Sequence, residues 1–196
     1  MMRQSQIKRI TKETSIEMSL CLEGTGQAQV DTGIGFMDHM FELLAFHSGI
    51  DCIVKCQGDL KVDSHHTVED LGIVFGECLK EALGDKKGIY RYGQMAIPMD
   101  EALVTTTLDL SGRPYLVYQA QLPCQHLGNY ETEMTKEFFK AVSDHALMTL
   151  HIVENYGENT HHIIEAMFKS FARALKQAIC IDEKNKEQIV SSKGVL

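Results

Sequence analysis

The chain has 196 residues, of which 44% are hydrophobic and 23% charged, and 19 Lys and Arg against 27 Asp and Glu give a formal net charge of −8. This composition is ordinary for a globular protein of one domain or two small ones, and it excludes disordered and fibrous classes. An acidic chain without a basic leader or an apolar run of about 18 residues is a poor partner for nucleic acid or membrane, and we expect a cytoplasmic protein.

Six cysteines are scattered along the chain without a CxxC pair. Most have apolar neighbours, and we expect buried, reduced thiols. The alternation in IDCIVKC predicts a strand in which Cys52 and Cys56 fill space, although a metal or redox pair at these two positions is an open alternative.

The predicted elements occur twice along the chain. The alternating segments SIEMSLCLEG and LVTTTLDLSG pair at an offset of 88, with Gly24 matching Gly112, and both are typical of a strand followed by a turn. A helical apolar stretch follows in each half, from Phe36 and from Met134. Further strands are then predicted at 50–56 and 148–153.

A long amphipathic helix ends each repeat. Residues 65–83 lie over 161–179 at an offset of 96 with seven identities, and apolar residues recur at helical spacing in both. Asp63 and Ser64 precede the first helix, as Asn159 and Thr160 precede the second, in the manner of N-cap residues. Gly84 is placed to end the first helix in a left-handed cap.

The repeat predicts an α+β protein of two tandem halves, each β-β-β-α-β-α. The halves cover residues 1–90 and 91–181, and a polar tail, 182–196, ends the chain with SSKG. We expect two sheets, each covered on one face by helices and packed together as one unit, because a half of this size alone buries limited surface.

Paired histidines and a glutamate open both long helices. Residues three or four apart share a helix face, so each HHxxE segment presents two imidazoles and a carboxylate within one turn. This donor set suits Mn²⁺, Fe²⁺, Zn²⁺ or Co²⁺ and differs from both HExxH and ExxH sites. A solvated polar face is the alternative, but two copies at the same register favour metal binding by two sets, His65, His66 and Glu69, and His161, His162 and Glu165.

The repeat also predicts further ligands in the preceding helices. His39 pairs with Glu137 at an offset of 98, whereas pairing His39 with His145 needs an offset of 106 that fits the flanking repeat poorly. We prefer Glu137. Packing or surface roles are expected for His47, His126 and His151.

Several long motifs closely resemble the imidazoleglycerol-phosphate dehydratase family of histidine biosynthesis, and the resemblance runs nearly end to end. They are GFMDHM, DSHHTVEDLG, PMDEAL to DLSGRPYL, MTLH, GENTHHIIEAMFKSFARAL and SSKG. The resemblance implies a ribosomal protein S5 domain 2-like fold. It also implies a lyase that dehydrates D-erythro-imidazole glycerol phosphate to imidazole acetol phosphate, using two Mn²⁺ ions where subunits meet in a 24-subunit shell.

The family's metal ligands carry over to matching positions in this sequence. The position that is commonly His in the family is Glu137 here, and a carboxylate also binds Mn²⁺. The implied ligands are His39, His65, His66, Glu69, Glu137, His161, His162 and Glu165.

The family's substrate contacts also carry over, and their cationic and hydroxyl groups suit a dianionic phosphate. They fall on Glu13, Arg91, Arg113, Lys169, Ser191 and Lys193. Our hypothesis for the reaction is that two metals favour the imidazolate form of the substrate ring while Glu13 acts as general acid and base. The alternatives are a two-metal phosphohydrolase of a small phosphorylated metabolite and a metal-storage shell.

Overall fold

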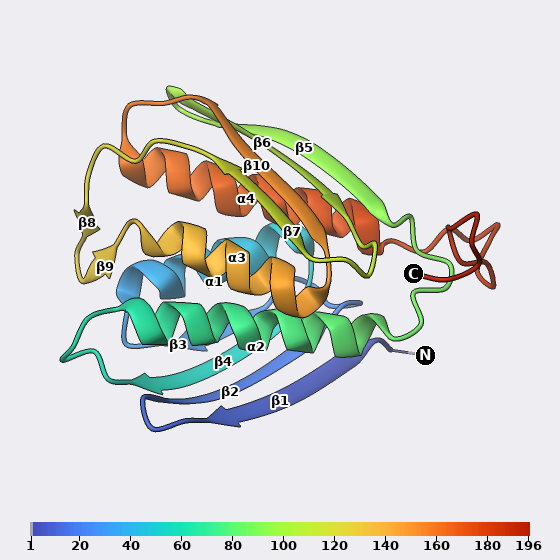
Figure 1. The fold of residues 1–196 in the computed structure, drawn as a ribbon, viewed down its shortest axis with the longest axis horizontal. Helices are drawn as coiled ribbons and strands as arrows, with labels where there is room; N and C mark the ends of the chain where they lie inside the picture. The colour runs from blue at the N-terminus through green and yellow to red at the C-terminus, as the bar shows by residue number, and fades with distance from the viewer. Residues whose placement is uncertain (1) are drawn as a thin grey trace.

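The computed structural model describes residues 2–196 and arranges them in four layers. A four-stranded sheet lies on each outer side, and the helices form two layers between the sheets (Figure 1). This arrangement confirms the predicted α+β fold of two tandem halves, in which helices cover one face of each sheet.

The two sheets have the same topology. In both, the strand that comes third along the chain lies at an edge of the sheet and is parallel to its neighbour, and the other two pairs are antiparallel. The first sheet has the order β1-β2-β4-β3, built from β1 (Gln4–Ile10), β2 (Thr14–Cys21), β3 (Ala28–Asp31) and β4 (Asp51–Gly58). The second has the order β5-β6-β10-β7, built from β5 (Tyr92–Met99), β6 (Ala102–Asp109), β7 (Tyr115–Gln119) and β10 (Thr149–Tyr156).

The four helices run in the same direction, and all begin at the left-hand end of the molecule in Figure 1. We call this end the helix-start end. The helices are α1 (Gly35–Ser48), α2 (His65–Leu83), α3 (Met134–Ala146) and α4 (Thr160–Ile179). None of the helices among residues 2–196 is long and apolar enough to cross a membrane.

One hydrophobic core joins the halves. Helix α2 packs against α3, and α1 packs against α4, so each helix contacts a helix from the other half. Phe41 and Phe75 of the first half meet Phe138 and Phe171 of the second edge to face, with ring centroids 5.7 and 6.5 Å apart. Because aromatic pairs of this geometry bury large apolar surfaces, they bind the two repeats together.

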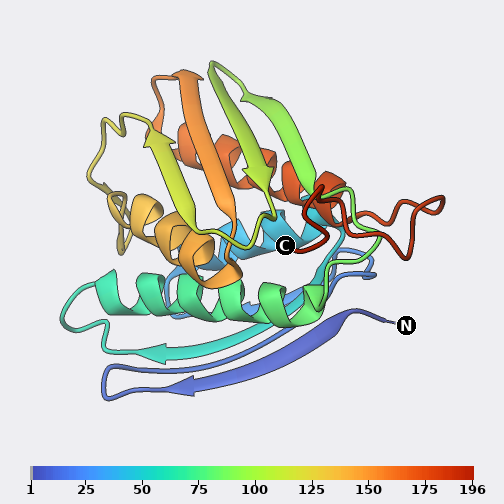
Figure 2. The same cartoon turned by 45° about the vertical axis from the view of Figure 1, so that its right-hand side comes forward.

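Two features depart from the repeated pattern. A short hairpin, β8 (His126–Leu127) and β9 (Tyr130–Glu131), lies between β7 and α3, and the first half has no counterpart between β3 and α1 among the described residues. The tail that follows α4 forms turns at the end opposite the helix starts (Figure 2). Its Gln188 oxygen accepts a hydrogen bond from the Gly88 backbone N–H at 2.8 Å.

The helix caps agree with the sequence in part. The Asn159 side chain accepts hydrogen bonds from the backbone N–H groups of His161 and His162. Gly84 ends α2 with a positive φ of 55°, but its ψ of −127° lies outside the left-handed helical region, so the predicted left-handed cap is wrong. Ser64 does not cap α2, because its hydroxyl bonds the Glu131 carboxylate of the hairpin instead.

The cysteines range from buried to exposed, with Cys21 half-buried. Cys52 and Cys56 point from β4 into the core, and burial raises the pKa of each thiol to about 12. Such thiols stay protonated at neutral pH and are poor metal ligands. The expectation of buried thiols is wrong for Cys124 and Cys180, which are exposed.

Candidate active site

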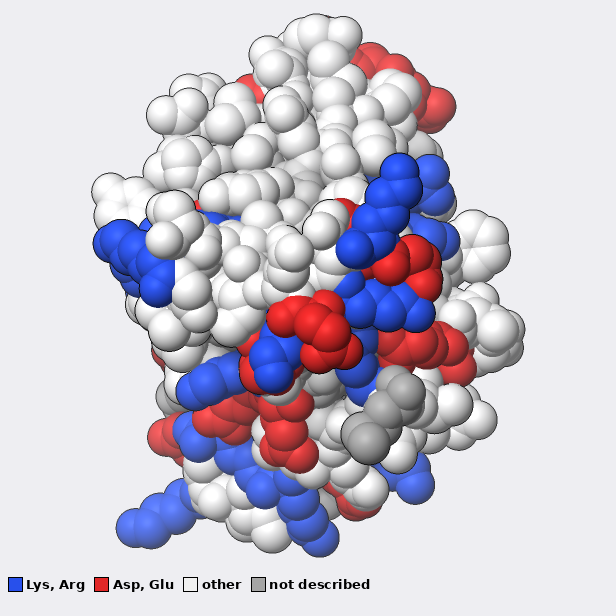
Figure 3. Space-filling model, turned by 90° about the vertical axis from the view of Figure 1, so that its right-hand side faces the viewer, with Lys and Arg blue, Asp and Glu red and all other residues white. Residues whose placement is uncertain are grey.

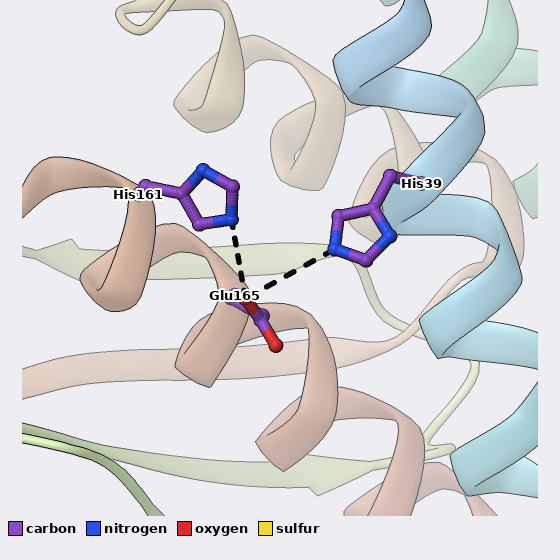
Figure 4. Close-up of side chains that lie close together, drawn as sticks. All are labelled: His39, His161 and Glu165. Atoms are coloured by element: carbon purple, nitrogen blue, oxygen red, sulfur yellow. Dashed lines mark ion pairs between the residues drawn. The ribbon is translucent and has the colours of Figure 1, made fainter.

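One group of side chains from different halves converges at the helix-start end. His39 comes from α1, and His161 and Glu165 come from α4 (Figure 4). Each offers a ligand atom, and these atoms lie within 4.8 Å of one another. Glu165 Oε2 is 3.2 Å from His161 Nε2 and 4.0 Å from His39 Nε2. Two imidazole nitrogens and a carboxylate oxygen are donors that a first-row divalent ion accepts.

Lys169 fixes the Glu165 carboxylate from the other side. Its Nζ lies 2.5 Å from Glu165 Oε1, one helical turn along α4. Burial acts to raise the pKa of Glu165, but the hydrogen bond and positive charge of Lys169 outweigh it, and the pKa lies below its ordinary value. One carboxylate oxygen is therefore held by the lysine while the other faces the two imidazoles.

The corresponding set on α2 is more open. His65 Nε2 lies 3.9 Å from Glu69 Oε2, and the His65 and Glu69 side chains are exposed by 46% and 49%. His66 Nδ1 donates to Asp59 Oδ2 at 3.0 Å, and His66 Nε2 lies 3.8 Å from Glu13 Oε1. The hydrogen bond to Asp59 raises the pKa of His66.

His162 has a close carboxylate partner on the β5–β6 turn. Its Nδ1 donates to Glu101 Oε2 at 2.7 Å. This hydrogen bond is the main cause that lowers the pKa of Glu101 to about 2, and it raises the pKa of His162. His162 Nε2 lies 3.8 Å from the carboxylate of Asp100.

Glu137 lies in the first turn of α3, half-buried, and outside the group formed by His39, His161 and Glu165. His145, the other residue weighed against it, lies in the last turn of α3, with Nδ1 3.4 Å from Glu77 Oε1. Glu137 therefore shares the helix-start end with the other ligand candidates, and His145 does not.

All eight candidate ligands occupy the first two turns of the four helices. Because the helices are parallel, this places the eight residues at one end of the molecule. Only three of them come within direct ligand distance of one another in the described part of a single chain.

A hydrogen-bonded turn holds Glu13 near this end. Thr11 Oγ1 accepts from the backbone N–H groups of Glu13 and Thr14, at 3.1 and 2.9 Å. The buried Asp70 of α2 accepts from the Thr14 hydroxyl and from Arg9 Nε. The turn is thereby tied to the helix that carries His66, while the Glu13 carboxylate stays exposed.

The other candidate phosphate contacts, apart from Lys169, lie at the opposite end. Arg91 donates to both oxygens of Asp109, at 2.7 and 3.0 Å, and to the Val190 oxygen at 2.6 Å, which places it beside Ser191. Its backbone N–H bonds Ala178 in the last turn of α4, 17 residues after His161. At 1.5 Å per residue this separation is about 25 Å.

Arg113 and Lys193 belong to the same end of the molecule. The Arg113 backbone oxygen accepts from the Ser111 hydroxyl at 3.3 Å, and a Cβ on the neighbouring Gly112 would lie 2.8 Å from Leu196 of the tail. Figure 3 faces this end and shows basic and acidic side chains interspersed over its middle and lower part. The phosphate candidates other than Lys169 thus lie far from the group formed by His39, His161 and Glu165 within one chain.

The sequence prediction did not include Asp59, Asp70 or Glu101. The repeat held a signal for Glu101, because the offset of 88 that pairs the first strands also pairs Glu13 with Glu101. No comparable signal marks Asp59 or Asp70, whose counterparts in the second half are not carboxylates.

The fold and the site define a duplicated α+β enzyme class in which carboxylates and imidazoles gather at the starts of parallel helices. A family model described as imidazoleglycerol-phosphate dehydratase matches residues 32–175. The chain belongs to the imidazoleglycerol-phosphate dehydratase family. This membership confirms the predicted activity, a carbon–oxygen lyase step of histidine biosynthesis that acts on a small phosphorylated substrate.

Relatives and solved structures match the chain over nearly its full length. The chain is 60% identical over 200 residues to the imidazoleglycerol-phosphate dehydratase of Lactococcus lactis subsp. lactis, with 100% of both chains covered. A crystal structure of the Staphylococcus aureus enzyme matches with a TM-score of 0.83 at 42% identity, covering 91% of this chain and 99% of that one. The Pyrococcus furiosus enzyme in complex with (S)-C348 has a TM-score of 0.83 at 34% identity, covering 97% of this chain and 100% of that one.

Proposed function

We propose that the chain dehydrates D-erythro-imidazole glycerol phosphate to imidazole acetol phosphate with two Mn²⁺ ions in each active site. The residues fit such ions, because nitrogen and carboxylate donors without thiolates suit Mn²⁺. The proposed ligands are His39, His65, His66, Glu69, Glu137, His161, His162 and Glu165.

The convergence of His39, His161 and Glu165 carries this proposal. Their ligand atoms lie within 4.8 Å of one another, and Glu165 is buried while the two imidazoles remain accessible from solvent. A buried carboxylate in contact with two imidazoles is costly unless charges compensate it, and Lys169 supplies only one side. A cation bound by Oε2 and the two imidazoles would use the ligand atoms that Lys169 leaves free.

When bound, the metals supply Lewis-acid stabilisation of negative charge on the substrate's imidazole ring. The chain's own residues do the remaining work. Arg91, Arg113, Lys169, Ser191 and Lys193 are proposed to hold the phosphate by charge-assisted hydrogen bonds and so to fix the substrate's orientation.

Glu13 is the proposed general acid and base. Its carboxylate is exposed on a turn whose backbone is fixed by Thr11 and Asp70, and it lies 3.8 Å from the Nε2 atom of His66. Removing the proton from the carbon next to the departing hydroxyl gives an enol, which becomes the ketone product. A carboxylate held beside the proposed ligand His66 can accept that proton and return one to the hydroxyl that leaves as water.

The separation of the two residue groups supports a site shared between chains. A three-carbon chain with one imidazole and one phosphate is much shorter than the roughly 25 Å of helix that divides His161 from Arg91. We therefore place the active site where the helix-start end of one subunit meets the tail end of another. A 24-subunit shell in the cytoplasm is part of this proposal.

Metal removal and reloading test the proposal. The protein is stripped with a chelator, reloaded with Mn²⁺ and incubated with imidazole glycerol phosphate, while ketone product, free phosphate and bound metal are measured. We expect ketone without phosphate release, and two ions per chain at saturation. One ion or none would contradict the two-metal site, and phosphate release would indicate hydrolysis.

The role of Glu13 has its own test. Glu13→Gln is expected to bind Mn²⁺ normally and to lose turnover by about 10²-fold or more, the usual contribution of a general acid and base. Turnover near that of the unchanged protein, with equal metal content, would remove Glu13 from the chemistry.

A further inference from the structure

The repeat places two carboxylates at the same position of two equivalent hairpins. Strands β1 and β2 pair Gln4 with Cys21, and β5 and β6 pair Tyr92 with Asp109, so both hairpins have the same register at an offset of 88. Glu13 and Glu101 therefore occupy matching positions in the two turns, next to α2 and α4.

These matching carboxylates face opposite nitrogens of matching histidines. Glu13 lies 3.8 Å from Nε2 of His66, whereas Glu101 is hydrogen-bonded to Nδ1 of His162 at 2.7 Å. In the first half the Nδ1 position is taken by Asp59, at 3.0 Å. Both histidines thus have a carboxylate on Nδ1, but it comes from different places in the two halves.

We propose that Glu101 is a positioning residue that holds the proton of His162 on Nδ1 and leaves Nε2 with a free lone pair. A neutral imidazole carries one N–H, so a carboxylate that accepts from Nδ1 sets the tautomer and the orientation of the ring. Asp59 has the same role for His66. This inference rests on the metal sites proposed above, because the free Nε2 is the atom that would bind the ion.

Glu101 is itself anchored. Its Oε1 accepts hydrogen bonds from the backbone N–H groups of Glu158 and Asn159, at 3.2 and 2.7 Å, just before α4. Only Oε2 is left for the imidazole. Asp59 is held less firmly, because its Oδ1 is buried without a hydrogen-bond partner among residues 2–196.

Because Glu101 is anchored more firmly than Asp59, a substitution at Glu101 is the sharper test. In Glu101→Gln, the two backbone N–H groups retain the amide oxygen and the NH₂ group faces the ring. The NH₂ group then donates a hydrogen bond to Nδ1 of His162, which favours the tautomer with its proton on Nε2. We expect the dissociation constant for Mn²⁺ at the affected site to rise about 10- to 100-fold, the usual effect of losing a hydrogen bond behind a metal ligand.

Two measurements test the expected changes in Mn²⁺ affinity and in the tautomer of His162. Isothermal titration with Mn²⁺ gives the affinity. Solid-state NMR of the metal-free protein with ¹⁵N-labelled histidine gives the tautomer, and the spectrum of His162→Asn identifies the His162 signals. A purely structural role for Glu101 would leave the tautomer unchanged.

Two further variants serve as controls. Glu158→Gln removes a carboxylate at the same helix start, and its side chain makes no hydrogen bond or ion pair in the described part of the chain. We expect its affinity to stay within about twofold of the unchanged protein. Asp59→Asn is expected to lose less Mn²⁺ affinity than Glu101→Gln, because the asparagine amide is free to turn its oxygen toward His66.

The outcomes are distinguishable. A proton on Nε2 of His162 in the unchanged metal-free protein overturns the proposal, as does Glu101→Gln with unchanged tautomer and affinity. If the tautomer switches in Glu101→Gln but the unchanged protein binds no Mn²⁺, the positioning role stands and the proposed metal function fails.

Discussion

The outer faces of the two sheets differ although their strands pair in the same register. A row across the first sheet joins Lys8, Glu17, Lys55 and Asp31 through direct cross-strand pairs, with alternating charge. The equivalent row across the second sheet joins Ala96, Thr105, Val153 and Gln119. Duplication has kept the pairing while the side chains of this row have lost their charges in the second sheet.

The interior of the site diverged in a different way. Both halves keep the two histidines and the glutamate, but within residues 2–196 only His161 and Glu165 of the second half join His39 in a compact group with a buried carboxylate. The first-half set is solvent-exposed and spread out. Chemistry-bearing side chains are thus retained while their partners change, and the partners determine whether a matching residue is buried, paired or free.

The largest expected contrast is between Glu165→Gln and Glu69→Gln. Both variants should lose turnover by two or more orders of magnitude, since each removes a proposed ligand. Only Glu165→Gln should also destabilise the metal-free protein, by about 1–3 kcal/mol. The substitution removes the buried carboxylate that pairs with Lys169 and leaves the lysine without a partner of opposite charge. Turnover assays and urea unfolding at one protein concentration measure both effects. Equal stability losses would show that the two sets are equivalent.

Helix packing provides the second contrast. A Cβ on Gly72 of α2 would lie 2.6 Å from the Phe138 backbone oxygen of α3, so α2 and α3 approach closely there. We expect Gly72→Ala to lower the free energy of unfolding by about 1–3 kcal/mol, although alanine favours helix formation. The matching position on α4 is Phe168.

Gly35→Ala is the control for this substitution, because no described residue lies within 4 Å of the place that its new methyl group would take. It should be neutral or slightly stabilising in the same urea series. A neutral Gly72→Ala would mean that α2 and α3 can separate without loss.

The stabilisation that Glu165 gains from Lys169 should depend on pH. Its pKa is lower in the folded chain than its ordinary value of 4.5, so the unfolded chain binds more protons in this range. The stabilisation is therefore fully present above pH 4.5 and is lost as the pH falls through the folded-state pKa. The stability difference between the metal-free protein and Glu165→Gln should shrink on acidification, and a difference that grows would contradict the assignment.

The smallest expected effect concerns the charged row on the first sheet. Lys55→Glu puts a carboxylate directly between Glu17 and Asp31 and should cost about 0.5–1 kcal/mol, less at high salt. Lys55→Gln, which removes the charge without reversing it, should cost less. Identical urea midpoints for both variants would show that the row contributes no measurable electrostatic energy.

Much of the fold was predictable because its signals lie along the chain. Constant offsets between the halves predicted the repeated order of elements. The paired histidines predicted metal ligands at the starts of α2 and α4, and the metal sites stay a prediction. The β8–β9 hairpin was missed since it has no counterpart to align with. Asp70 was missed because it depends on contacts with Arg9 and Thr14, which lie in a segment distant in sequence. Asp59 lies only seven residues before His66, but it belongs to the loop between β4 and α2, where no periodicity marks it.

The distance between the group of His39, His161 and Glu165 and the Arg91 region could not be predicted from the sequence either. Each group was found by residue type, and residue type does not tell which end of a helix a neighbouring loop reaches. Three-dimensional placement turned one list of candidate substrate contacts into two separate groups, with Glu13 and Lys169 beside the metal candidates and the others at the opposite end.

That separation has a kinetic consequence. If neither end of a chain holds a whole site, the number of working sites depends on how many chains are associated, and catalysis follows a mass-action law in the protein itself. Specific activity should then fall on dilution and recover on concentration, and two inactive variants, one altered at His161 and one at Arg91, should regain part of the activity when mixed.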